Sequence, residues 1–161
     1  NQEGLIWFID KCWPIINEKF PKLKFYIAGR RAPEWLARRF KAPNIIFEGE
    51  VTDAYDFMNS KSIMVVPLFS GSGMRIKIIE GMALGKPIVT TPIGTEGIST
   101  VSGKNIMIAD NVQEFIFHIE QLISDQELFN SIGFNAIEYI HEKFDNLKLS
   151  NSLINFYKQH I

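Results

Sequence analysis

The chain has 161 residues, which is the size of one domain, and apolar residues make up 46% of it, as in globular proteins. Its formal net charge of -1 provides no basic field for nucleic acid, and no acidic tail is present. Cys12 is the only cysteine, which excludes an internal disulfide and a thiolate metal cluster. No run of about 18 apolar residues occurs, so we expect no transmembrane helix.

The first third of the chain predicts alternating helices and strands. Apolar residues at helical spacing predict a helix from Leu5 to Phe20, which Pro21 ends. A strand is expected at residues 23–28 and a short helix at 34–40. A second strand follows at 44–48, and Asp53 then has the position of an N-cap for a helix running through Met58.

The remainder continues the alternation, with strands expected at residues 62–67, 88–91 and 106–109 and helices at 74–84, 112–124, 126–143 and 146–159. The strands are short, continuous apolar runs, which is typical of a parallel sheet buried on both faces. We therefore predict a single α/β domain with a Rossmann-like parallel sheet and helices on both faces. Ligands of such sheets bind at the carboxyl ends of the strands, and the loops there are rich in glycine.

The segment from Val65 to Gly97 (VVPLFSGSGMRIKIIEGMALGKPIVTTPIGTEG) indicates an anion site. A Gly-Ser-Gly loop lets a ligand approach the backbone, and a helix follows whose first N–H groups lack partners. Arg75 and Lys77 place positive charge against the helix dipole, at a cost of about 0.3–1 kcal/mol each, which a bound anion would offset. We therefore favour a phosphate site over a solvated basic helix end.

Glu80 lies on the same helix face as Lys77. Its carboxylate either accepts hydrogen bonds from a ribose diol or forms an ion pair with Lys77, and the spacing alone does not separate these alternatives. Two familiar phosphate motifs are absent from the segment. The dinucleotide fingerprint lacks its third glycine at Ile76, and GMALGK is one residue too short for a P-loop and is followed by Pro87.

The segment resembles retaining GT-B glycosyltransferases of family 4 type, in the subgroup with P-L-x-x-G-S-G-M-R-x-K-x-x-E-x-M-A-x-G-K-P. The resemblance covers nearly the whole chain, because it extends to Asn1, Gly4, Leu5, Trp7 and Phe8, to Ile27-Ala28-Gly29, and to Phe47, Gly49, Val51 and Asp53. It implies that this chain forms the C-terminal half of a GT-B fold. The acceptor-binding half and one strand precede this segment in the family, so we expect a fragment of a longer two-domain enzyme.

The resemblance also implies roles for individual residues. Glu80 matches the second glutamate of the family's E-x7-E motif, which binds the donor ribose, whereas Ser72 stands where the first glutamate would be. This departure removes a carboxylate that contacts the transferred sugar in the family. The candidate donor-binding residues are Gly29 and Arg30 near phosphate, Gly49, Glu50 and Val51 near the nucleobase, and Ser72, Gly73, Met74, Arg75, Lys77 and Glu80; charge alone suggests Arg75 and Lys77 as diphosphate stabilisers.

The implied reaction is metal-independent, retaining transfer of a sugar from a nucleotide-diphosphate donor to a glycan or lipid-linked acceptor. We expect no metal and no cofactor besides the donor, since there is no D-x-D and His118, His141 and His160 are scattered. No nucleic-acid partner is expected. By family habit the enzyme acts in polysaccharide biosynthesis in the cytoplasm or at the inner face of the membrane. Without the N-terminal half, this chain is predicted to be inactive.

Two other functions remain open at this point. A GT-B-like nucleotide-sugar epimerase would bind the same donor, and a non-catalytic sugar- or protein-binding module could use the same fold. The charges at Arg75, Lys77 and Glu80 argue against the module, which would have little reason to gather them at one sheet edge. The nucleobase, the sugar, the acceptor and the linkage are not determined by the sequence.

Overall fold

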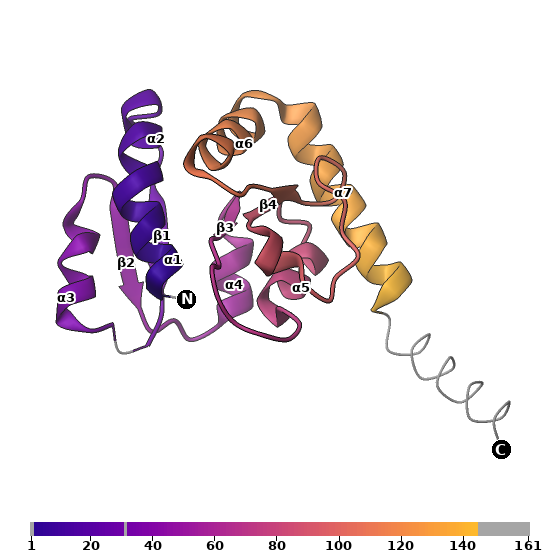
Figure 1. Ribbon diagram of the computed structural model, residues 1–161, viewed down its shortest axis with the longest axis horizontal. Helices are drawn as coiled ribbons and strands as arrows, with labels where there is room; N and C mark the ends of the chain where they lie inside the picture. Colours follow the sequence, from indigo (N-terminus) through magenta and orange to yellow (C-terminus); the bar gives the residue numbers. More distant parts are fainter. Residues whose placement is uncertain (1, 31, 145–161) are drawn as a thin grey trace, which may run out of the picture.

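Parallel strands alternate with helices along the computed structural model, which describes residues 2–30 and 32–144 (Figure 1). One parallel sheet has two strands, β1 (Phe25–Ala28) and β2 (Ile45–Gly49). The other is parallel with the order β3 (Met64–Val66), β4 (Ile88–Thr90) and β5 (Met107–Ile108). The predicted α/β class with helices around a parallel sheet is confirmed.

The helices are α1 (Gln2–Trp7), α2 (Trp13–Lys19), α3 (Glu34–Ala37), α4 (Ala54–Asn59), α5 (Ile76–Ala83), α6 (Val112–Ser124) and α7 (Gln126–Lys143). Short 3-10 turns lie at Arg39–Lys41 and Pro92–Thr95. The predicted bounds of α6 and α7 are confirmed, because Asn111 and Asp125 cap them by accepting hydrogen bonds from the N–H groups of Glu114 and Leu128. The helix predicted at 146–159 lies outside the described residues.

The first predicted helix is interrupted. A π-helical turn at Phe8–Cys12 separates α1 from α2, and the N–H of Trp13 donates to the carbonyl of Phe8. Pro14 follows in the first turn of α2. A proline has no N–H and its ring collides with the carbonyl four residues earlier, so a wider turn at this point accommodates it. The helix predicted at 34–40 is likewise divided into α3 and the 3-10 turn after it.

Alternate residues of the three-stranded sheet pack on opposite faces. Val65 and Val89 contact the core formed with α6 and with the helices α1 and α2, which includes Phe115. Met64 and Ile88 belong to a second core with α5 and α7. The sheet is therefore apolar on both sides, which is why its strands read as continuous hydrophobic runs.

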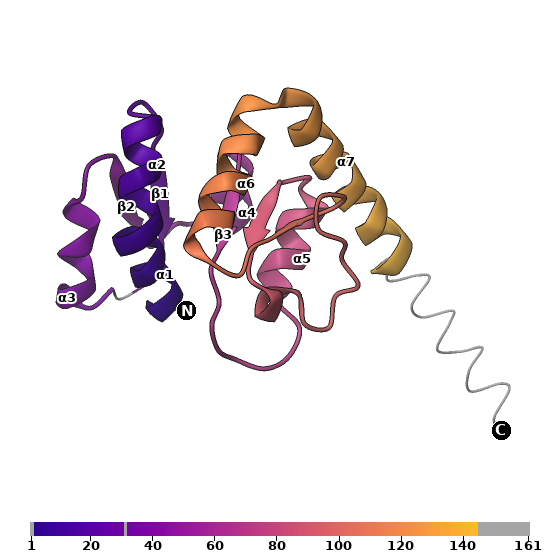
Figure 2. The same cartoon turned by 45° about the horizontal axis from the view of Figure 1, so that its top comes forward.

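The parallel strands of the described residues form two sheets, because β1 and β3 do not pair. A hollow of about 290 Å³ lies between them, lined by Phe25 and Tyr26 on one side and by Ile63 and Val65 on the other. Ile119 of α6 also lines it, and α6 packs against both α2 and β4 (Figure 2). Helix packing, rather than strand pairing, joins the two parts.

The loops that follow β1, β2 and β3 lie at the same edge of the molecule, the lower edge in Figure 1. This arrangement agrees with the prediction that the glycine-rich loops share one edge. None of the helices in the described residues is long and apolar enough to span a membrane.

Candidate functional site

Two buried threonines anchor the loop that follows β3, residues 67–75. The Thr90 hydroxyl donates to the carbonyl of Val66 at 2.7 Å. The Thr91 hydroxyl donates to the carbonyl of Leu68 and accepts from the N–H of Gly94 at 3.3 Å. Because both threonines are buried, the start of the loop is fixed to the end of β4.

Helix α5 lies very close to the sheet. A Cβ at Gly81 would come within 2.7 Å of the Met64 sulfur and 3.0 Å of Ile88 Cδ1. The helix begins at Ile76, two residues later than predicted, and the N–H groups of Ile78 and Ile79 both donate to the carbonyl of Arg75. The N–H groups of Ile76 and Lys77 precede these bonds, so they lie at the open end of the helix.

The Gly-Ser-Gly loop curves around the Arg75 side chain. Gly71 and Gly73 have φ angles of 123° and 81°, which favour glycine. A side chain at Gly71 would meet both terminal guanidinium nitrogens of Arg75 at 3.0 Å. One of these nitrogens, Nη1, donates to the Ser72 carbonyl at 3.0 Å, whereas Nε and Nη2 are buried and have no hydrogen-bond partner among the described residues. The positive charge of Arg75 therefore lies directly behind the loop backbone.

Glu80 is paired with a residue that the sequence did not suggest. The Tyr55 hydroxyl, on α4, donates to Glu80 Oε1 at 3.2 Å. The salt bridges within the described residues do not include one between Glu80 and Lys77, whose side chain is exposed. The hydrogen bond to the Glu80 carboxylate, together with its negative charge, raises the pKa of Tyr55.

A sequence signal for Tyr55 does exist. It is an aromatic residue in the first turn of a helix that starts right after the loop at residues 49–53. Asp53 caps this helix as predicted, by accepting hydrogen bonds from the N–H groups of Tyr55 and Asp56 at 2.7 and 3.1 Å. Because this capping fixes the first turn, the ring is presented at the same edge as the loop.

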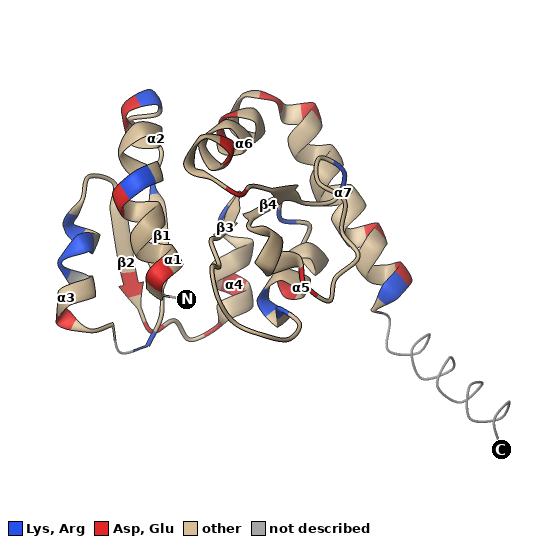
Figure 3. Cartoon of the chain, viewed as in Figure 1, with Lys and Arg blue, Asp and Glu red and all other residues tan. Residues whose placement is uncertain are grey.

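The loops after β1 and β2 are brought together as predicted. The N–H of Gly29 donates to the carbonyl of Gly49 at 2.7 Å. Arg30 Nε forms an ion pair with Glu50 Oε1 at 2.7 Å, although the two side chains are 78% and 60% exposed. Val51 is half-buried beside them. Figure 3 shows charges of both signs along this edge, so Arg30 is partly neutralised.

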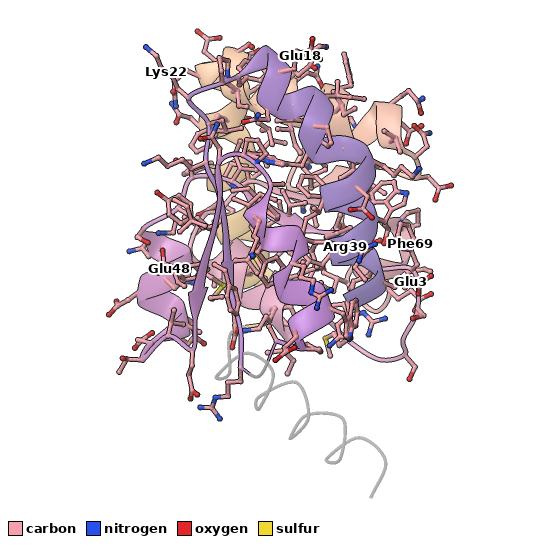
Figure 4. The ribbon with its side chains drawn as sticks, turned by 90° about the vertical axis from the view of Figure 1, so that its left-hand side faces the viewer. Glu3, Glu18, Lys22, Arg39, Glu48 and Phe69 are labelled. Carbon is pink, nitrogen blue, oxygen red and sulfur yellow. The ribbon has the colours of Figure 1, made fainter. Side chains whose placement is uncertain are left out.

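A second hollow, of about 510 Å³, lies beside α1 and is lined by Glu3, Trp7, Trp35 and Phe69, among others. The rings of Trp7 and Phe69 meet edge to face with centroids 5.0 Å apart. Figure 4 shows Glu3 and Phe69 near each other, and Glu48 on the opposite side of the view. Neither of these two hollows is lined by Glu80, which is half-buried on α5.

Within residues 2–30 and 32–144, no three His, Cys, Asp or Glu side chains gather in a way that could hold a metal ion. His118, on α6, has its ring nitrogens 3.1 Å from the Ile108 carbonyl and 3.3 Å from Gln121 Oε1. These contacts give His118 a structural role at the end of β5.

Residues 1–125 match the family described as glycosyl transferases group 1. An uncharacterized 44.6 kDa protein in the cps region of Klebsiella pneumoniae is 28% identical over 162 residues, which cover 95% of this chain and 42% of that protein. The capsular polysaccharide biosynthesis glycosyltransferase CapM of Staphylococcus aureus is 27% identical over 117 residues, or 71% of this chain and 30% of CapM. The chain therefore spans less than half the length of these curated relatives.

The crystal structure of a variant of S. aureus TarM, in complex with fondaparinux, alpha-GlcNAc-glycerol and UDP, has the same fold. Its TM-score is 0.81 at 21% identity, and the match covers 96% of this chain and 33% of that chain. At this identity the likeness shows the fold, which is that of the C-terminal domain of GT-B glycosyltransferases. The family model matches residues 1–125 of this chain, and the fold agrees with that match. The chain therefore belongs to the group 1 glycosyltransferases.

Proposed function

We propose that this chain is the donor-binding half of a retaining, family 4 type glycosyltransferase, which transfers a sugar from a nucleotide diphosphate without a metal ion. One observation carries the proposal. A glycine-rich loop, the open N-terminus of α5, Lys77 and the Glu80 carboxylate lie within one short segment at the carboxyl edge of the sheet. This combination suits a diphosphate next to a ribose.

The diphosphate is proposed to bind at the start of α5. The N–H groups of Ile76 and Lys77 and the exposed Lys77 ammonium would stabilise the negative charge that builds on the leaving group. Arg75 would add charge from behind the loop, which it also shapes through its bond to the Ser72 carbonyl. The backbone of Gly73 and Met74 would then face the donor sugar.

The nucleoside is proposed to bind between α5 and the loops after β1 and β2. The Glu80 carboxylate would accept hydrogen bonds from the ribose hydroxyls. A carboxylate has about four lone-pair positions, and Tyr55 occupies only one of them. Gly49, Glu50 and Val51 would border the base, and Gly29 and Arg30 would lie near phosphate. UDP is the first nucleotide to test, because the TarM structure contains it.

The chain is proposed to be a single domain, residues 1–161, of a longer enzyme whose N-terminal half binds the acceptor. A parallel strand connected through α1 and α2 to β1 would lie beside β1 if the crossover is right-handed, and the hollow between β1 and β3 is at that position. We further propose that this half alone transfers no sugar. The complete enzyme would act on a glycan or lipid-linked acceptor in the cytoplasm or at the inner face of the membrane.

Ligand-observed NMR with UDP, GDP, ADP and their glucose and mannose conjugates tests this proposal. One nucleotide series should bind with and without EDTA, and Glu80→Ala should weaken its binding by about tenfold or more, since hydrogen bonds to a charged group are lost. Glu138→Ala, at an exposed glutamate of α7, is the matched control and should bind normally. Absence of binding by folded protein at millimolar nucleotide, or binding that EDTA abolishes, would contradict the proposal.

A further inference from the structure

Tyr55 occupies a position that packing does not explain. Its side chain is 51% exposed, and α4 contributes no buried residue to the core. The hydroxyl reaches from α4 to Glu80 on α5 and donates to Oε1 at 3.2 Å. The contact therefore links α4, which follows the loop proposed to border the nucleobase, to Glu80, which is proposed to bind the ribose.

The hydrogen bond affects how Glu80 is presented. A glutamate side chain has several rotatable bonds, and fixing one carboxylate oxygen removes part of that freedom before a ligand arrives. Oε2 and the second lone pair of Oε1 remain available, which is enough for two ribose hydroxyls. A carboxylate that is ordered in advance loses less entropy when the ligand binds.

We propose that Tyr55 is a positioning residue of the donor site, which holds the Glu80 carboxylate in place for the vicinal diol of the ribose. This inference rests on the proposed function, since it assigns Tyr55 to the same site. The raised pKa of Tyr55 is consistent with it, because the phenol stays protonated, and so remains a donor, up to and beyond its ordinary value of 10.0.

The test compares Tyr55→Phe with wild-type protein, using whichever of UDP, GDP or ADP binds and the 2′,3′-dideoxy form of the same nucleotide. Tyr55→Phe should weaken binding of the ribonucleotide by about threefold to tenfold, as expected for one hydrogen bond. It should leave binding of the dideoxynucleotide unchanged, because that ligand does not use Glu80. Tyr139→Phe, whose ring packs on Phe144, serves as the control and should change neither affinity.

A second measurement follows the phenol itself. In wild-type protein without nucleotide, the Tyr55 pKa measured by NMR should lie above that of a free tyrosine, and Glu80→Gln should bring it back toward the ordinary value. An unchanged pKa in Glu80→Gln would show that the hydrogen bond does not form in solution and would overturn the inference.

The remaining outcomes separate this inference from the proposed function. One outcome is that wild-type protein binds the ribonucleotide more tightly than the dideoxynucleotide, and that Tyr55→Phe binds the ribonucleotide at least as tightly as wild-type protein does. The role of Tyr55 is then overturned and that of Glu80 stands. Equal weakening of both nucleotides would also overturn it, since a loss independent of the ribose is structural. If wild-type protein binds the two forms equally, or binds no nucleotide, the proposed function fails and this inference fails with it.

Discussion

The two parts of the proposed donor site are built very differently. On the three-stranded side, buried contacts hold the loop and helix that carry Lys77 and Glu80: the threonine hydroxyls at the end of β4 and the close approach of Gly81 to the sheet. On the two-stranded side, the candidate side chains Arg30 and Glu50 are largely exposed and bind each other. An exposed ion pair contributes little, about 0–1 kcal/mol.

The difference indicates where binding energy should be concentrated. A group that is already fixed before binding loses little freedom when a ligand arrives. The α5 side is therefore expected to supply most of the affinity for a nucleotide. On the other side, the Arg30 side chain can contribute only after it exchanges Glu50 for a ligand oxygen. The first three of the following predictions set a change on one side against a matched change on the other, and the fourth concerns the core between them.

The largest effect is expected where α7 meets the end of α5. A Cβ at Gly133 would lie 2.5 Å from the Gly85 carbonyl oxygen. Gly133→Ala should therefore lower the free energy of unfolding by about 3 kcal/mol, even though alanine favours a helix. Gly29→Ala, on the two-stranded side, has no atom within 4 Å of its Cβ and should leave it unchanged. Urea denaturation measures the free energy of unfolding of both variants. Similar losses in the two would contradict the expected difference between the two sides.

The next effect concerns the anchor of the loop at residues 67–75. Thr91→Val removes the donor to the Leu68 carbonyl, whereas the Gly94 N–H keeps its bond to the Thr91 carbonyl. We expect a loss of about 2 kcal/mol in unfolding free energy, since the Leu68 carbonyl loses its buried donor, together with weaker nucleotide binding. Thr52→Val, at an exposed position before α4, is the control. Unchanged stability of Thr91→Val would show that the loop is not anchored there.

Charge removal compares the two sides directly. Lys77→Ala should weaken nucleoside diphosphate binding by about tenfold, as for loss of a charge-assisted hydrogen bond. Arg30→Ala should weaken it less, because Arg30 is already paired with Glu50. Isothermal titration calorimetry at low and high salt measures both, and the effect of Lys77→Ala should shrink as salt increases. A larger effect of Arg30→Ala than of Lys77→Ala would show that the loops after β1 and β2, and not α5, supply most of the affinity.

The smallest effect concerns the ionisation of Cys12, which is buried in the core that joins the two sides. At neutral pH this ionisation should not change the free energy of unfolding. Burial raises the pKa of its thiol to about 12 from 9.0. The native thiol should not react with a thiol reagent near pH 8 and should react after unfolding. Above pH 9 the unfolded chain loses this proton and the folded chain keeps it, so stability should fall with pH. Cys12→Ala should reduce that fall in urea titrations at pH 9–11.

The sequence predicts the elements where local chemistry is decisive. Asn111 and Asp125 supply N-cap oxygens, so the bounds of α6 and α7 follow from those residues. The apolar strands predict the parallel class because both faces of the sheet are buried. Because the carboxyl ends of parallel strands share one edge, the glycine-rich loops are also expected there. These features depend on short stretches of chain and on general rules of parallel sheets.

Features that depend on distant contacts could not be predicted. Strand pairing depends on which strand edges come together in the fold. In the described residues β1 and β3 do not pair, and a hollow lies between them. The charge pattern shows that Arg75 is positive but not that its guanidinium is enclosed by the loop. The spacing of Lys77 and Glu80 leaves open whether Glu80 forms an ion pair or binds a ribose, and it gives no indication of Tyr55, the partner 25 residues earlier.

Amide chemical-shift mapping with the nucleoside diphosphate that binds tests the location of the donor site most directly. We expect the largest shifts in residues 71–80, at the loop and the start of α5, with smaller shifts at Gly29, Gly49 and Val51. Tyr55 should shift with the first group through its bond to Glu80. Shifts centred on the hollow between β1 and β3, or on α7, with residues 71–80 unmoved, would show that the nucleotide does not bind at α5.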